Sequence, residues 1–251
     1  MTIRPLSPEL AEKARLELFE DPKKIESDLE HIKEWIKKQP HLRARTDDQW
    51  LVAFLRGCKY SLERTKEKID LYYSMRTLVP ELFFSRKHTD PVFQEILASG
   101  YVINSQKYGN SALGLIFQIM LYEDDNTVVA GSKFIMDLEG VGMSFFLQMT
   151  PSLMKKMSVY TQVYSILHVY NKNYEDMYQH IPKEILPVEY GGNGGTIAEI
   201  VEYWQKKIAE YSDWLDEDIQ YGTDESKRPG KPKSAEEMFG VDGSFRQLDF
   251  D

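Results

Sequence analysis

The chain carries a nearly uninterrupted apolar run from Val128 to Met136, VVAGSKFIM, which stops abruptly at Asp137. The run has the length of a strand, and its Val, Ile and Phe residues favour extended structure. A strand that is apolar on both faces is typical of a parallel or mixed sheet with both sides covered. We therefore expect a covered central strand here, with helices from elsewhere in the chain packed on the sheet.

Start signals for helices are clear in the first third of the chain. Ser7-Pro8 and Asp21-Pro22 each offer an N-cap followed by proline. Thr46 and Gln49 have the spacing of a capping box, and Ser61 can cap a further helix. Apolar residues then recur at helical spacing: Ile25, Leu29, Ile32 and Ile36, followed by Trp50, Leu51, Phe54 and Leu55. Residues 1–80 are predicted to form a helical subdomain.

Helical and β patterns alternate in the rest of the chain. Asp90-Pro91 starts a short helix, and residues 111–122 are apolar nearly all round except at Gln118, which predicts a helix buried on most sides. The glycines of residues 186–195 indicate a sharp turn before a capping box at Thr196 and Glu199. The fold class is α/β: a helical subdomain (1–80), an α/β domain (81–220) and a linker and tail (221–251).

Composition excludes several classes of function. The net charge of −9 over 251 residues argues against nucleic-acid binding and, on average, against anionic membranes, although a local basic patch can still dock there. Cys58 is the single cysteine, so no internal disulfide is possible. The N-terminus has no apolar leader, and no stretch approaches 18 apolar residues. We expect a soluble, cytoplasmic protein.

Catalytic groups are sparse. Asp137 and Glu139 could form an acid–base or metal pair, but no His, Cys or third acid lies nearby to complete a site. Strand-end carboxylates more simply hold backbone amides or a basic side chain, and the acidic residues 123–125 are expected to form a solvated turn. No Ser occupies a G-x-S-x-G elbow. We therefore expect no catalytic residue, no metal and no cofactor.

Large, flexible apolar residues are abundant around the predicted strand. Ser132, Phe134 and Met136 alternate onto one side of it, and Met149, Met157 and Tyr160 share a helical register that can face it. This composition suits a hydrophobic pocket with a few polar groups such as Gln118 and Ser132. A solid core explains the same residues, so both interpretations stay open at this point.

Four motifs in order resemble those of the CRAL-TRIO lipid-binding family, most closely its insect members. They are DDQWLVAFLRGCKYSLERTKEKI with FLR at Phe54–Arg56, FIMDLEGV at 134–141, LQMTPSLMKKMS at 147–158, and HIPKEILPVEYGG at 180–192. The resemblance implies a mixed sheet flooring an apolar cavity, with helices as the other walls and a movable helix as gate. It favours the pocket over the solid core.

The resemblance also implies a function without catalysis. The protein would bind a hydrophobic molecule, such as a tocopherol, retinoid or carotenoid, and carry it between membranes as a monomer, touching the membrane transiently through phosphoinositides. A non-transferring adaptor with the same fold is the alternative. The implied ligand-binding residues are Gly114, Gln118, Ser132, Phe134, Met136, Met143, Met149, Met157 and Tyr160.

The chain departs from the family pattern at two places. Little remains of a strand and loop that family members have between Tyr101 and Tyr108. After Gln162 the family's buried strand, gate helix and basic residues are missing, and the chain runs almost directly into VYSILHVYNKNY. A cavity without its lid would expose a large apolar patch. We therefore expect a shortened variant or a sequence that lacks segments of the natural chain, and favour the second.

Overall fold

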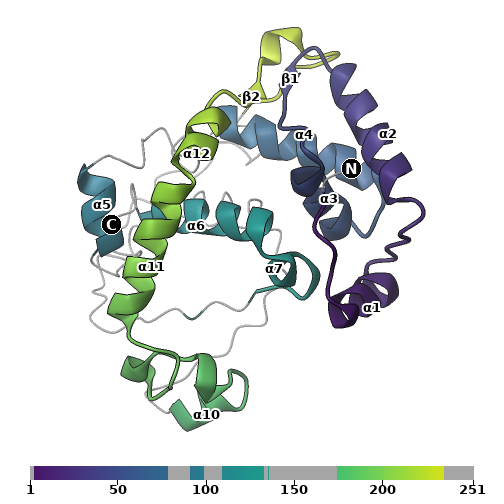
Figure 1. The fold of residues 1–251 in the computed structure, drawn as a ribbon. Coiled ribbons are helices and arrows are strands. Elements are labelled where there is room, and N and C mark those ends of the chain that lie inside the picture. The colour runs from purple at the N-terminus through teal and green to yellow at the C-terminus, as the bar shows by residue number, and fades with distance from the viewer. Residues whose placement is uncertain (1–2, 79–90, 99–108, 133–134, 136–173, 235–251) are drawn as a thin grey trace, which may run out of the picture.

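The computed structural model of the chain describes residues 3–78, 91–98, 109–132, 135 and 174–234. These residues are mostly helical, with one small sheet (Figure 1). The longer elements, in chain order, are α1 (Pro8–Glu17), α2 (Ile25–Lys37), α3 (Asp48–Gly57), α4 (Leu62–Leu78), α5 (Pro91–Ala98), α6 (Gly109–Glu123), α11 (Ile197–Glu210) and α12 (Ser212–Asp218). The short ones are β1 (Leu42–Arg43), α7 (Asp125–Val129), α10 (Tyr174–Tyr178), η1 (Lys183–Ile185), η2 (Val188–Tyr190), β2 (Gly222–Thr223) and η3 (Glu225–Lys227).

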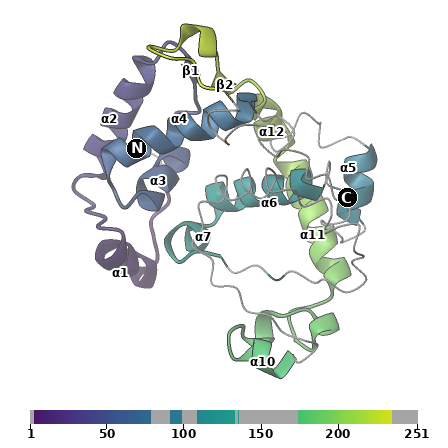
Figure 2. The ribbon, with the colours of Figure 1, turned by 180° about the vertical axis from the view of Figure 1, so that it is seen from behind.

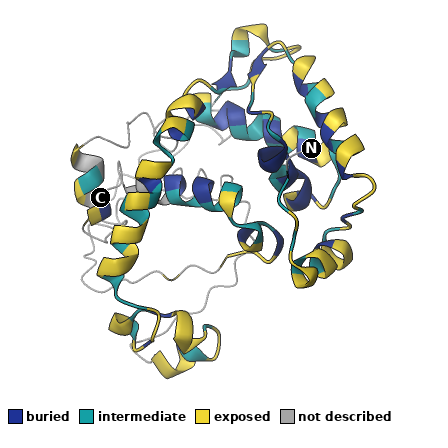
Figure 3. Cartoon of the chain, viewed as in Figure 1, coloured by how far each residue is buried: buried dark blue, intermediate teal, exposed yellow. Residues whose placement is uncertain are grey.

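The N-terminal helices α2, α3 and α4 enclose the larger described core. The predicted stripe of α2 is buried at all four positions, and it packs with Leu51, Val52 and Leu55 of α3 and with Ile69 and Tyr73 of α4. Trp50 is 1% exposed and meets Phe54 and Tyr72 edge to face. Figure 3 shows the buried residues gathering on α3, α4 and α6. The predicted helical character of residues 1–80 is confirmed over the described part.

Two of the predicted helix starts are displaced. α1 begins as expected, with the Ser7 hydroxyl accepting from the Leu10 amide and Pro8 at the first position. α2 begins only at Ile25, so Pro22 does not open it. α3 is capped by Asp47, whose carboxylate accepts from the Trp50 amide, and the capping box expected at Thr46 is wrong. An aspartate is as good a cap as threonine, and it lies one residue closer to the helix.

The second described core lies where α5, α6, α11 and α12 meet. Leu115 and Ile119 of α6 pack with Leu97 of α5, Ile208 of α11 and Leu215 of α12. Figures 1 and 2 show α6 between the N-terminal helices on one side and α11 and α12 on the other. The helix predicted at 111–122 is thus confirmed, as are the helix start at Pro91 and the capping box of Thr196 and Glu199.

The strand expected from Val128 to Met136 is wrong over its described part. The Asp124 carboxylate accepts from the Asn126 amide and from the Thr127 hydroxyl, and this cap starts the helix α7. Val128 and Val129 therefore end a helix, and the residues from Gly131 to Ser132 are not in a strand. Local capping outweighs the β propensity of the valines. The sheet floor itself stays a prediction, because residues 133–134 and 136–173 lie outside the described residues.

The glycine-rich segment forms the expected sharp turn. Gly191 has a left-handed φ of 73° at the end of η2. A Cβ on Gly192 would lie 2.1 Å from the Leu186 carbonyl oxygen, so only glycine allows the two backbones to meet. The Glu189 carboxylate accepts from the first amide of α11, at Ile197. The Glu189 carboxylate therefore satisfies the first amide of this helix.

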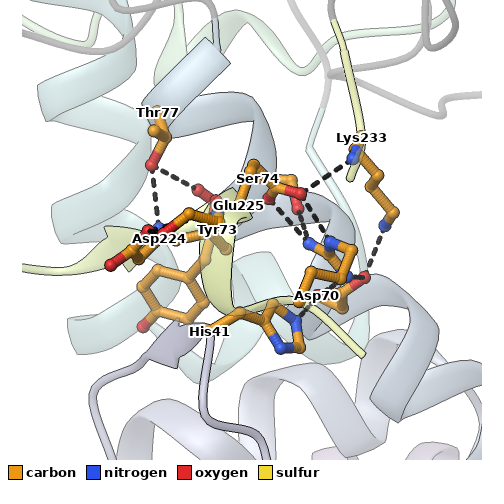
Figure 4. A network of polar contacts seen from close by, with 11 residues as sticks. His41, Asp70, Tyr73, Ser74, Thr77, Asp224, Glu225 and Lys233 are labelled. Carbon is orange, nitrogen blue, oxygen red and sulfur yellow. Dashed lines mark hydrogen bonds and ion pairs between the residues drawn. The ribbon is translucent and has the colours of Figure 1, made fainter. Parts of the chain in front are cut away.

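Residues 222–233, which we call the C-terminal strap, return to the N-terminal helices. Leu42 of β1 pairs with Thr223 of β2 in an antiparallel sheet. Both oxygens of Asp70 on α4 accept from Arg228 at 2.9 Å. Lys233 also binds Asp70, as Figure 4 shows. His41 Nε2 lies 2.8 Å from the same carboxylate. The sequence predicts a linker and tail here, whereas the structure binds the segment to α4 and β1. The domain boundaries themselves stay a prediction.

Candidate ligand-binding site

Helix α6 positions two of the predicted ligand-binding residues. Gly114 and Gln118 lie one turn apart on a single face of α6, and both are buried. Leu115 and Ile119 flank them and fill the second core. The helix is apolar nearly throughout, so Gln118 places an isolated amide inside an apolar layer. A buried amide needs hydrogen-bond partners, because an unpaired one costs about 1–3 kcal/mol.

Gln118 meets a buried carboxylate from a distant part of the chain. Its Nε2 donates to Oδ2 of Asp218 at 2.6 Å, and Asp218 is 2% exposed at the end of α12. Arg76 of α4 binds the same carboxylate oxygen at 2.6 Å and donates to the Asp218 backbone carbonyl at 2.9 Å. The Nε of Arg45 lies 3.6 Å from Oδ1. We call these four side chains the Asp218 cluster.

Aromatic rings and further acceptors hold the two arginines of the Asp218 cluster. The Arg45 guanidinium lies 4.2 Å from the Trp214 ring centre and 5.1 Å from that of Tyr221, and it binds Glu217 at 3.2 Å. Burial alone would lower the pKa of Arg76, but Tyr72 and Asp218 outweigh it and raise that pKa. The Arg76 guanidinium therefore stays charged beside Asp218.

The structure does not bring all predicted site residues together. Gly114 and Gln118 share the inner face of α6, whereas Ser132 is exposed in the segment that follows α7. Phe134, Met136, Met143, Met149, Met157 and Tyr160 lie outside the described residues, and so do Asp137 and Glu139. The assignment of these residues to a pocket stays a prediction.

A second buried polar cluster corrects the expectation of a solvated turn at Asp125, whereas Glu123 is exposed as expected. Arg56, 1% exposed, binds Asp125 at 2.9 Å and Glu20 at 2.8 Å. Arg4 binds Asp125 at 3.1 Å, and Tyr60 donates to Glu20. Asp125 therefore ties α7 to the N-terminal helices. Its partners are 69 or more residues away in sequence, so the acidic run gave no local sign of this role.

Other kinds of site find little support in the described part of the chain. A groove of about 340 Å³ lies beside β1, between Ile36, Leu42 and Tyr221, and it contains none of the predicted ligand-binding residues. Within the described ranges, no three His, Cys, Asp or Glu residues are grouped to hold a metal ion. No helix in those ranges is both long and apolar enough to cross a membrane.

Comparison with known proteins finds similar proteins over most of the chain. Residues 21–93, which run from the approach to α2 into α5, match the model of the Pinta-like, UBA domain. Over most of its length the chain is similar to proteins of the CRAL-TRIO lipid-binding family. The particular relatives are clavesins. Clavesin-2 of Homo sapiens is 25% identical, with 90% of this chain and 85% of the relative aligned. Clavesin-1 of Xenopus laevis is 26% identical over 60% of this chain and 52% of its own length.

The alignment with Clavesin-2 is longer than this chain. It runs over 288 positions, more than the 251 residues of the whole chain. Part of the aligned Clavesin-2 sequence therefore faces gaps in this chain. The two departures from the family pattern, near residues 101–108 and after Gln162, are where we predict those gaps.

Proposed function

We propose that the protein binds a hydrophobic small molecule, such as a tocopherol, retinoid, carotenoid or other lipid, and carries it between membranes. The similarity to clavesins and the CRAL-TRIO lipid-binding family over most of the chain is the observation that carries this proposal. The apolar helix α6, with Gln118 as its isolated inner polar group, supports it. Neither observation calls for catalysis, and the proposed mechanism contains no chemical step.

Binding would follow from burial of the apolar ligand. Each Å² of apolar surface removed from water contributes about 25 cal/mol, so a lipid-sized ligand is held without any strong polar contact. We place its polar end near Gln118 and its body along the predicted apolar wall. Release would occur at a membrane, because there the departing ligand meets another apolar medium. We further propose a cytoplasmic monomer that touches membranes only transiently.

The test is to identify lipid carried by the purified protein. Native mass spectrometry and solvent extraction should detect about one hydrophobic molecule per chain. After delipidation, the protein should take up fluorescent retinol from vesicles and deliver it to acceptor vesicles. Protein that copurifies with no lipid and takes none from vesicles would contradict the proposal.

A second candidate is an adaptor that keeps the fold without transfer activity. The alignment gaps opposite Clavesin-2 favour it, because the resemblance assigns the gate to the segment after Gln162. The two candidates separate in the vesicle assay. A carrier moves lipid at a rate that rises with protein concentration, whereas an adaptor leaves the spontaneous rate unchanged even if it retains bound lipid.

A further inference from the structure

The groove beside β1 combines buried apolar residues with exposed cations. Ile36 and Leu42 are buried, and together with Tyr221 they form an apolar floor. Lys37 and Arg43, both exposed, also line the groove, and no acid is among the described residues around it. Although the whole chain has a net charge of −9, this groove is therefore locally positive.

Arg43 supplies a free positive charge at the groove. Within the described ranges its guanidinium binds no carboxylate, whereas Arg45, two positions further on, binds Glu217. Lys37 binds Glu34 at 2.5 Å, but both of these side chains are more than half exposed. An exposed ion pair contributes little to stability, so Lys37 can exchange Glu34 for another carboxylate.

Two distant parts of the chain build the groove. Residues 36–44 include the end of α2 and β1, whereas Gln220 and Tyr221 directly precede β2. β1 pairs with β2, and Arg228 then fixes the C-terminal strap to Asp70 of α4. Figures 1 and 2 show β1 and β2 beside one end of α2. The sheet and the strap therefore hold the walls of the groove in place before any partner binds, which lowers the cost of binding.

The size of the groove suits one or two side chains better than a whole lipid. Its volume of about 340 Å³ is at the lower end of the range for small-molecule pockets, and it is open along one side. A lipid placed there would keep much of its apolar surface in water, whereas a peptide needs to bury only a single side chain. The Gln220 amide, which lines the groove, offers both a donor and an acceptor to a peptide backbone.

We propose that this groove docks an acidic segment of a partner protein. One large apolar side chain of the segment lies on the floor, and neighbouring carboxylates bind Arg43 and Lys37. Complementary charge selects this partner, because a basic segment would meet two cations and a neutral one would leave Arg43 unpaired. The inference goes beyond the proposed function, since none of the predicted ligand-binding residues lines the groove.

Three blocked pentapeptides, EEFEE, EEGEE and KKFKK, test the two parts of the proposed recognition. Titration of the full chain, followed by NMR of its backbone amides, should give EEFEE a Kd of about 1 mM or tighter. The amides of Leu42, Arg43 and Tyr221 should shift. EEGEE lacks the apolar side chain and KKFKK reverses the charge, so each should bind at least about fivefold more weakly. Non-specific attraction to a chain of charge −9 would give the opposite order for EEFEE and KKFKK.

A charge reversal and a matched control assign the preference to the groove. Arg43→Glu should weaken EEFEE at least about fivefold and should strengthen KKFKK, because the same position then attracts the opposite charge. Arg64→Glu makes the same change on α4, at an exposed arginine that does not line the groove, and should keep the wild-type order and affinities. Amide spectra away from the groove check that both variants are folded.

Each contrary result overturns the inference without touching the proposed function. Tighter binding of KKFKK, equal affinities for the three peptides, or no shift with any of them would contradict it. Shifts confined to residues outside the groove, or an equal loss of EEFEE binding in Arg43→Glu and Arg64→Glu, would contradict it as well. The proposed function is judged separately, by the lipid that the purified protein carries and takes from vesicles.

Discussion

Arg56 carries one of the most deeply buried charges among the described residues. Its guanidinium is held between Glu20 and Asp125, so Arg56→Met leaves two carboxylates without their main partner. Removing one member of a buried ion pair typically costs about 3–5 kcal/mol. We expect a loss of that size in the free energy of unfolding, measured by urea denaturation.

Arg15→Met is the matched control for this change. Arg15 pairs with Glu12 on the surface of α1, where both side chains are more than half exposed. Exposed pairs are worth about 0–1 kcal/mol, so the control should stay close to the wild type. A loss of similar size in both variants would show that the burial of Arg56 is not the cause.

Glu225 makes the stability of the strap depend on pH. Hydrogen bonds from Arg228 lower the pKa of Glu225 from 4.5 to about 2, against an opposing effect of burial. Between those values the unfolded chain binds a proton that the folded chain does not, so stability present above pH 4.5 is lost as the pH falls. Urea unfolding at pH 5.5 and pH 3.0 should show a smaller loss in Glu225→Gln than in the wild type. Equal losses in the two proteins would contradict the assignment.

At the scale of elements, the turn before α11 depends on one close backbone contact. A Cβ on Gly192 would meet the carbonyl group of Leu186, with atoms at 2.1 and 2.5 Å, and backbone cannot move aside cheaply. Gly192→Ala should therefore lower the melting temperature by several degrees.

Gly57→Ala is the same substitution at a site with open space. No atom lies within 4 Å of a Cβ placed on Gly57, which ends α3 without a positive φ. Alanine there reduces the freedom of the unfolded chain and favours the helix, so the melting temperature should stay level or rise. If both alanines lowered it alike, the contact with Leu186 would not be the reason.

Local sequence signals predicted elements better than they predicted contacts. The capping box at Thr196 and the burial of the α2 stripe follow from residues a few positions apart, and both are found. Even so, Gln49 is drawn away from the expected box at Thr46 because it binds Asp125 and the Arg4 amide. The β propensity of the run after Asp124 predicts a strand, but the aspartate cap starts a helix there.

The candidate site was predictable only at Gln118, an isolated amide in an apolar helix. Its partner Asp218 lies 100 positions away, in a helix with several other acids, and nothing local distinguishes it from Asp216. Arg76 lies 142 positions from Asp218, and Arg45 lies farther still. Pairings of this kind depend on how whole helices pack, so a single sequence without that packing does not specify them.

At the scale of the whole molecule, three polar clusters join the N-terminal helices to later parts of the chain. The first is the pairing of Arg56 with Asp125 of α7, and the second is the Asp218 cluster at α6 and α12. The third is the binding of the strap to Asp70 of α4. Buried charges tolerate little displacement, because each lost partner leaves a costly unpaired group. We therefore expect the described parts to unfold together, as one cooperative unit, with the strap included.

Hydrogen exchange tests this expectation through the strap. The amide of Thr223 donates to Thr77 and that of Asp224 to the His41 carbonyl, so both should exchange as slowly as the core amides of α3. Asp70→Asn removes the carboxylate that Arg228 and Lys233 share, and the two strap amides should then exchange at least tenfold faster than those of α3. Glu63→Gln, at an 80% exposed side chain of the same helix, should leave the pattern unchanged. Fast exchange at Thr223 and Asp224 in the wild type would show instead that the strap opens independently of the helices it crosses.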